Sequence, residues 1–226
     1  MENQDSSVIR VFVVRHGQTA WNIEKILQGH QDIALNETGH SQARLLGSRF
    51  KDIDFDMWIS SDLKRCIQTT QGIEAAVGAD KVPGQFVKSP AFRERFMGDV
   101  EGMKIGEAKA KYGEGFRNRG EKKEDMIARI YKRWLECLAM CAQEGYRNVL
   151  LCTHGGVIRN FVNYLYHEQG YQLGPGMTAA DLRVPYNTSV TVLDVKRADI
   201  CAGTIERFGC TEHLGEQKEV GDKDLR

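Results

Sequence analysis

Two histidines, each at the end of an apolar run, are the side chains of this sequence best suited to chemistry. His16 follows a run rich in β-branched residues over residues 8–14, and His154 follows a second run over residues 148–153. Such runs predict strands buried on both faces, and ligands of open α/β sheets bind beyond the carboxyl ends of such strands. If the two strands lie parallel in one sheet, both rings emerge at the same edge. We therefore expect His16 and His154 to face each other.

Cationic and polar side chains near these histidines suit a phosphoryl group. Arg15 precedes His16, and Arg65 falls in the first turn of a predicted helix, so two guanidinium groups are available for phosphate oxygens. Asn22 can donate a further hydrogen bond, and the helix N-terminus after Ser61 adds backbone dipoles. One histidine could then act as the nucleophile through an unprotonated ring nitrogen. The other, if protonated, would donate to the oxygens that gain charge.

The leaving alkoxide of such a transfer needs a proton, and Glu94 is the candidate general acid. Its aromatic neighbours, Phe92 and Phe96, favour a neutral carboxyl group. Its cationic neighbours, Arg93 and Arg95, favour an ionised one. The sequence alone leaves the protonation state of Glu94 open.

Each of these residues also has a plainer interpretation. A lone histidine at a strand end is more often structural or a metal ligand, and Arg65, Glu94 and Asn22 could be a solvated helix residue, a surface carboxylate and a cap. Two histidines could together hold a metal ion. Arg15 beside His16 would repel a cation, however, and no carboxylate stands at a ligand-like spacing next to either histidine. We therefore expect no metal at this site.

Four stretches resemble, in order, the motifs of the histidine phosphatase superfamily, the phosphoglycerate mutase-like proteins. They are RHGQTAWN at 15–22, SSDLKRCIQT at 60–69, RERFMGDVEG at 93–102 and THGGVIR at 153–159. The resemblance extends from about residue 8 to residue 208. It implies an α/β fold, a three-layer αβα sandwich with a mostly parallel central sheet, and a reaction that uses no metal and no cofactor.

The resemblance also implies a role for each matching residue. His16 would be the phosphorylated nucleophile and Glu94 the proton donor, while the phosphate pocket and substrate contacts would come from Arg15, Arg65, His154, Asn22, Gln28, Gly29 and Gly155. The sequence GEK at 120–122 resembles a Gly-Glu-Ser motif of the phosphatase branch, with Arg129 downstream. Lysine here replaces the serine of that motif.

The composition indicates an ordinary globular protein. Of the 226 residues, 41% are hydrophobic, and 31 Lys and Arg balance 31 Asp and Glu, so bulk charge attracts neither nucleic acid nor membrane. No apolar run approaches the roughly 20 residues that span a bilayer. The six cysteines show no CxxC spacing, which favours reduced thiols and a cytoplasmic location, with a nuclear pool left open. We expect a small phosphorylated substrate as the main partner and leave a homodimer open.

Periodicity and turn residues divide the chain into one domain over residues 1–214, with a lid-like insertion at about 97–123 and a disordered tail at 215–226. The expected helices are one capped at Asn36, one capped by residues 60–62 and ending near 77, and others at 105–112, 124–143 and after Thr153. Further strands are expected at 55–59, within 83–90, and as an antiparallel pair at 190–193 and 204–208. Residues 169–185 are expected to form a loop.

Hydrolysis of phosphate monoesters is the function that we expect. The alternative is a cofactor-dependent phosphoglycerate mutase, but related mutases have a longer insertion between the acid and the second histidine than residues 95–153 provide. An inactive scaffold would lack one of four side chains that are all present here: His16, Arg65, Glu94 and His154. A protein phosphatase is a further alternative. The lid is rich in Lys and Arg, which fits either a sugar bisphosphate substrate or a solvated charged surface: Lys104, Lys109, Lys111, Arg117, Arg119, Lys122 and Lys123.

Overall fold

A single mixed sheet forms the centre of the computed structural model, which describes residues 2–215. Its seven strands follow the order β3-β2-β4-β1-β6-β7-β5, and four of the six pairings are parallel. The strands are β1 (Val8–Arg15), β2 (Met57–Ser61), β3 (Phe86–Ser89), β4 (Asn148–Thr153), β5 (Gln172–Leu173), β6 (Val190–Lys196) and β7 (Gly203–Cys210). The expected three-layer, mostly parallel α/β sandwich is confirmed, as is the antiparallel pair β6–β7.

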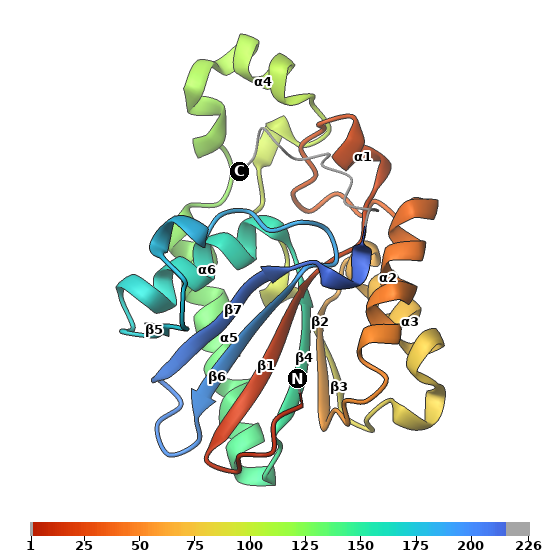
Figure 1. Ribbon diagram of the computed structural model, residues 1–226. Helices are drawn as coiled ribbons and strands as arrows, with labels where there is room; N and C mark the ends of the chain where they lie inside the picture. The colour runs from red at the N-terminus through yellow and green to blue at the C-terminus, as the bar shows by residue number, and fades with distance from the viewer. Residues whose placement is uncertain (1, 216–226) are drawn as a thin grey trace.

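Helices cover both faces of this sheet (Figure 1). The α2 (Glu37–Arg49) and α3 (Lys64–Val77) helices pack on one face, and α5 (Lys123–Glu144) and α6 (Gly155–His167) pack on the other. Alternate residues of β1 supply both cores: Val11 and Val13 join the α5–α6 side, while Phe12 and Val14 join the α2–α3 side. This two-sided burial explains why β1 is apolar without interruption.

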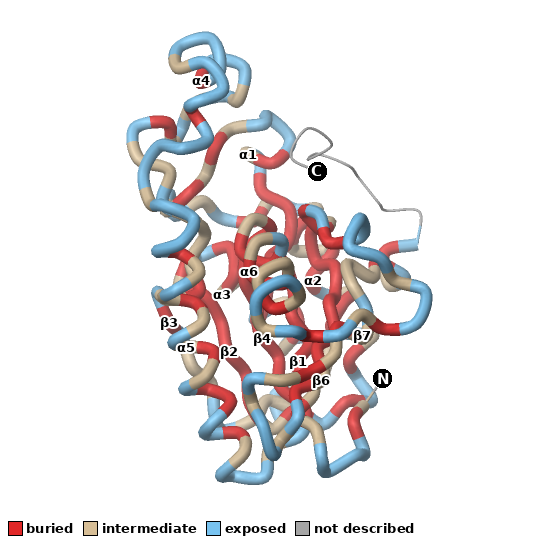
Figure 2. The backbone as a smooth tube through the Cα atoms, turned by 90° about the vertical axis from the view of Figure 1, so that its left-hand side faces the viewer, coloured by how far each residue is buried: buried red, intermediate tan, exposed pale blue. Residues whose placement is uncertain are grey.

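The lid stands beyond the carboxyl edge of the sheet and is mostly exposed (Figures 1 and 2). It contains α4 (Ile105–Tyr112), at the predicted residues, and it packs around a small core of Leu27, Val100, Ala108 and Phe116. The remaining short helices are α1 (Ala20–Ile23), η1 (Ala79–Lys81), η2 (Pro90–Phe92), η3 (Gly98–Val100), η4 (Gly113–Asn118), η5 (Ala179–Asp181) and η6 (Glu212–Leu214).

The predicted start of α3 is wrong. Its N-cap residue is Leu63, which makes no capping bond through its side chain. The three expected capping residues are engaged elsewhere: Ser60 Oγ donates to the carbonyl oxygen of Ser61, Ser61 Oγ lies 2.8 Å from His154 Nε2, and the Asp62 carboxylate accepts two hydrogen bonds from Arg93. Tertiary contacts therefore outcompeted a local cap.

Other boundaries differ by a few residues. The expected second strand at 55–59 lies at Met57–Ser61, and the expected loop at 169–185 includes the short strand β5. Apart from Gly215, the predicted disordered tail falls outside the described residues. All six cysteines are free thiols, and four of them are buried. Among the helices of the described chain, none has both the length and the apolar character that a membrane span requires.

Candidate active site

The two histidines lie together because β1 and β4 are adjacent and parallel. Their register pairs Arg15 with Thr153, so the next residue of each chain leaves the sheet at the same edge. The backbone N–H of His16 donates to the carbonyl oxygen of Thr153 at 2.9 Å. The ring centroids of His16 and His154 are 5.3 Å apart, and both residues are buried. The predicted convergence is confirmed.

Neighbouring atoms fix the tautomer of each ring. His16 Nδ1 lies 2.7 Å from the carbonyl oxygen of Gly17, which can only accept, so Nδ1 carries the hydrogen and Nε2 carries a lone pair. His154 Nδ1 accepts from the Nε–H of Arg65 at 3.2 Å, which places the hydrogen of His154 on Nε2, facing Ser61 Oγ. His16 therefore has the form that a nitrogen nucleophile needs.

Burial and the nearby arginines keep both rings neutral. Burial, Arg65 and Arg15 hold the pKa of His16 well below its usual value near 6.5. Burial and Arg65 do the same to the pKa of His154, with smaller effects from His16, Arg15 and Arg129. His154 is therefore a neutral ring rather than a cationic donor, because two guanidinium groups already supply positive charge beside it.

Arg15 and Arg65 are buried side chains whose orientation is fixed by backbone carbonyl groups. Arg15 Nη1 donates to the carbonyl oxygen of Pro185 at 2.8 Å. Arg65 donates to the carbonyl oxygens of Gly29 and Gln31 at 2.8 and 2.7 Å. These bonds hold the guanidinium groups in place before any ligand arrives, which lowers the cost of binding an anion.

A cavity of about 350 Å³ opens over these residues, a size that suits a small organic ligand. Its apolar wall includes Trp21, Ile105 and Val184. Its lining contains one carboxylate, Glu94, against seven basic side chains: Arg15, Lys25, Arg65, Arg95, Arg117, Lys123 and Arg159. The cavity is therefore strongly cationic in a chain whose net charge is zero.

Glu94 enters this cavity from the segment between η2 and η3, held by two backbone N–H groups. Its Oε2 accepts from Gly156 at 2.8 Å, and its Oε1 accepts from Arg95 at 2.9 Å. The Arg93 side chain pairs with Asp62 instead, and the Arg95 side chain donates to carbonyl groups of residues 117, 119 and 121. Neither neighbouring guanidinium group therefore forms an ion pair with Glu94.

Comparison with known proteins agrees with this arrangement. The profile of the histidine phosphatase superfamily (branch 1) matches residues 11–205. This chain belongs to the histidine phosphatase superfamily. A broad-specificity phosphatase of Saccharomyces cerevisiae is 41% identical, with 100% of this chain and 95% of that protein aligned. A protein of Schizosaccharomyces pombe named as a phosphatase is 34% identical, covering 94% and 98% of the two chains.

The fold comparison gives the same family. The crystal structure of a phosphoglycerate mutase from Bacillus anthracis superimposes with a TM-score of 0.76 at 25% identity, over 95% of this chain and 99% of that one. The expected phosphoglycerate mutase-like architecture of this histidine phosphatase is thus confirmed.

Of the other residues predicted to bind substrate, Asn22, Gln28, Gly29 and Gly155 line the cavity of this superfamily member. His154 does not line it, because its ring is fully buried behind the cavity wall, between His16, Arg65 and Ser61. Asn22 is also a cap, because its Oδ1 accepts from the N–H and hydroxyl of Thr19, which leaves its NH₂ group as the end that can donate to a ligand. Gln28 donates to Thr19 Oγ1, and Gly29 has a φ of +47°, which favours glycine. A side chain on Gly155 would meet the Arg15 guanidinium.

Sequence reasoning missed part of the cavity wall. Arg159 and Asn160 line it and follow Gly155 and Gly156 by four residues, so helical spacing from the predicted site would have found them. Lys25 and Val184 come from loops, and no local pattern marks them. Between residues 2 and 215, no group of three His, Cys, Asp or Glu side chains is placed to hold a metal ion.

Proposed function

We propose that this histidine phosphatase hydrolyses phosphate monoesters of small molecules through a phosphohistidine on His16. The observation that carries the proposal is the lone pair of a neutral His16 Nε2, placed in a cavity with two fixed guanidinium groups and a single carboxylate. Arg15 and Arg65 would bind the transferred phosphoryl oxygens. The His154 Nε2–H would turn from Ser61 toward the same oxygens as negative charge develops.

The proposed reaction has two steps with balanced atoms. In the first, His16 Nε2 attacks phosphorus, the P–O ester bond breaks, and Glu94 gives its proton to the departing alkoxide oxygen. In the second, a water molecule attacks phosphorus and loses a proton to Glu94, and the P–N bond breaks. Inorganic phosphate leaves, and His16 and Glu94 return to their starting forms.

The rim of the cavity supports a substrate with a second anionic group, such as a sugar bisphosphate. Arg117 and Lys123 are exposed side chains that line the cavity. Two other lid cations pair with carboxylates instead: Lys109 pairs with Glu114, and Arg119 pairs with Asp99. Arg117 and Lys123 therefore fit the interpretation of the lid as a binding surface for a bisphosphate. Lys109 and Arg119 fit the interpretation of the lid as a solvated charged surface.

We further propose that the substrate is a small metabolite and that the protein works in the cytoplasm. The volume of the cavity, about 350 Å³, suits a small metabolite. The free thiols suit the cytoplasm, where disulfides are rare.

Release of inorganic phosphate from p-nitrophenyl phosphate, without bisphosphoglycerate, tests the function. The wild type should release phosphate, and His16→Ala should lose at least about a thousandfold of that rate. The control His167→Ala, at the exposed end of α6, should keep it. Interconversion of phosphoglycerates that depends on bisphosphoglycerate, without phosphate release, would instead identify a mutase. Full activity of His16→Ala would contradict both reactions.

A further inference from the structure

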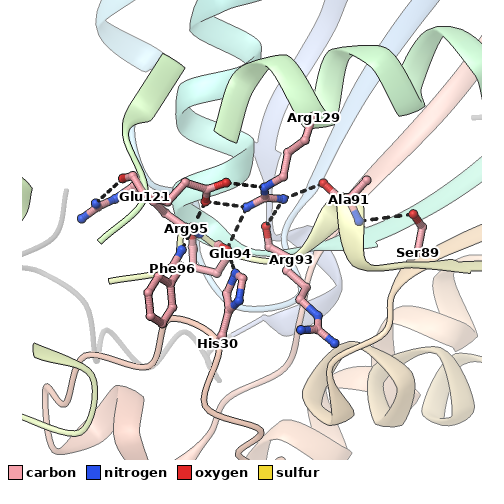
Figure 3. A network of polar contacts seen from close by, with 9 residues as sticks. All are labelled: His30, Ser89, Ala91, Arg93, Glu94, Arg95, Phe96, Glu121 and Arg129. Carbon is pink, nitrogen blue, oxygen red and sulfur yellow. Dashed lines mark hydrogen bonds and ion pairs between the residues drawn. The ribbon is translucent and has the colours of Figure 1, made fainter. Parts of the chain in front are cut away.

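One arginine outside the cavity wall binds the segment that carries Glu94 (Figure 3). Arg129, in the second turn of α5, donates from Nη1 to the carbonyl oxygens of Ala91 and Arg93 at 2.6 and 3.0 Å. Its Nη2 donates to the carbonyl oxygen of Glu94 at 3.0 Å. A single guanidinium group therefore contacts three of four successive peptide groups, ending at the proposed proton donor.

Glu121 holds this guanidinium group in place. Its two carboxylate oxygens accept from Arg129 Nε at 2.6 Å and from Nη2 at 2.9 Å, the fork-to-fork geometry of a strong ion pair. Both side chains are largely shielded, with 23% and 17% of their surfaces exposed, so water competes little for these bonds. Burial opposes ionisation of Glu121, but Arg129 outweighs it and holds the pKa of Glu121 below its usual value.

The segment is also fixed from its other sides. The Glu94 carbonyl oxygen accepts a second bond, from His30 Nε2 at 2.8 Å. Glu121 Oε2 accepts from the N–H of Phe96 at 3.2 Å, and the N–H of Glu121 donates back to the Phe96 carbonyl oxygen at 2.8 Å. The backbone on both sides of Glu94 is thus bound to the same ion pair. Because the ion pair fixes the backbone on both sides of Glu94, it also fixes the direction in which the Glu94 side chain leaves that backbone.

We propose that Arg129 and Glu121 are a positioning pair that holds the Glu94 carboxyl group at the place where it protonates the leaving oxygen. This proposal rests on the proposed function. Neither residue lines the cavity, so neither would touch the substrate. They act through Glu94, because a shift of about 1 Å in a catalytic group costs a large part of its effect.

Such a role has a signature that general stabilisation lacks. A nitrophenolate leaves readily without a proton, whereas a simple alkoxide needs one in the transition state. General acid catalysis contributes about 10²- to 10⁴-fold to the rate. When the acid is misplaced, the substrate with the poor leaving group loses this contribution. Misplacing Glu94 should therefore slow the hydrolysis of an alkyl phosphate far more than that of p-nitrophenyl phosphate.

The experiment compares kcat/KM on glycerol phosphate and on p-nitrophenyl phosphate for Arg129→Met and Glu121→Gln. This constant covers only the steps through departure of the alcohol, so hydrolysis of the shared phosphohistidine, in which Glu94 acts as the base, does not mask the difference. Both variants should lose at least about tenfold more kcat/KM on the alkyl phosphate, and Arg129→Lys should recover part of the loss. The control is Arg133→Met, which removes the more exposed Arg133–Glu136 pair one turn further along α5. It should leave the ratio of the two rates as in the wild type.

Equal losses on both substrates would overturn the positioning role, as would an unchanged ratio. If Arg129→Met does not fold, the ratio for the nearly isosteric Glu121→Gln decides. Failure of the proposed function is a separate result, because His16→Ala would then release phosphate as fast as the wild type, whatever the two pair variants do.

Discussion

At the level of single residues, the two arginines serve His16 in two ways. Their charges and its burial hold the pKa of His16 well below the usual value, so Nε2 keeps its lone pair across the neutral pH range. The same two guanidinium groups face the cavity that would receive the phosphoryl group. The positive charges of Arg15 and Arg65 thus have two effects. They keep His16 unprotonated, and they would bind the phosphoryl oxygens that His16 attacks.

Gly156→Ala tests how closely Glu94 is placed. A Cβ atom here would lie 2.5 Å from Glu94 Oε1, and the flexible carboxyl end would move rather than the backbone. We expect kcat on an alkyl phosphate to fall by roughly tenfold or more, while stability stays level or rises by up to about 1 kcal/mol, because alanine favours helix. Steady-state kinetics and urea unfolding measure both effects.

Gly106→Ala is the matched control, because Gly106 is also the second residue of its helix and nothing lies within 4 Å of its would-be Cβ. Activity should stay at the wild-type level. A Gly156→Ala enzyme with unchanged turnover of alkyl phosphates would contradict the assigned role of Glu94.

At the level of elements, the sequence predicts what depends on local pattern. Uninterrupted apolar runs placed His16 and His154 at two strand ends, and parallel pairing of β1 with β4 then brought them together. The α3 cap failed as a prediction because Ser61 engages a histidine 93 residues away. The bonds from Arg129 to the Glu94 segment were equally invisible, because they cross 35 to 38 residues and follow no periodicity.

The lid should loosen independently of the main sheet. Phe116 is fully buried in the small lid core, which is separate from the two clusters on the faces of the sheet. Phe116→Ala should cost about 3–5 kcal/mol within the lid and leave the main unfolding transition nearly unchanged. Hydrogen exchange over residues 97–123 should speed up strongly, and less so for Phe116→Leu. An equal loss of protection in β1 and β4 would show that the lid and the sheet unfold as one unit.

Two cations of the lid region should select for a second anionic group. Replacing both Arg117 and Lys123 by alanine should raise KM for a hexose bisphosphate roughly tenfold, since exposed ion pairs are each worth about 0.2–1 kcal/mol. KM for a hexose monophosphate should change by less than about twofold. The Lys111→Ala, Lys132→Ala double variant removes two exposed cations that do not line the cavity. An equal effect of both double variants would contradict selective recognition at the rim.

At the level of the whole molecule, the chain buries histidines in neutral form. The pKa values of His16 and His154 lie well below 6.5, mainly through burial. Burial, with help from Arg49, also lowers the pKa of His213 to about 4, although Glu212 opposes the shift. The unfolded chain binds protons at these positions near pH 6.5, whereas the folded chain does not. Acid therefore favours unfolding both through the two active-site histidines and through His213, which lies outside the active site.

His213 allows this linkage to be measured away from the active site. Because its folded pKa is lower than its unfolded value, its contribution to stability is fully present above about pH 6.5. The contribution is lost as the pH falls toward 4, at up to about 1.4 kcal/mol per pH unit. From pH 7.5 to pH 5, His213→Gln should therefore lose less stability than the wild type, by up to about 2 kcal/mol. Urea unfolding at both pH values measures the difference, with exposed His167→Gln as the control. An identical pH dependence in His213→Gln and the wild type would mean that this ring is not held neutral by its surroundings.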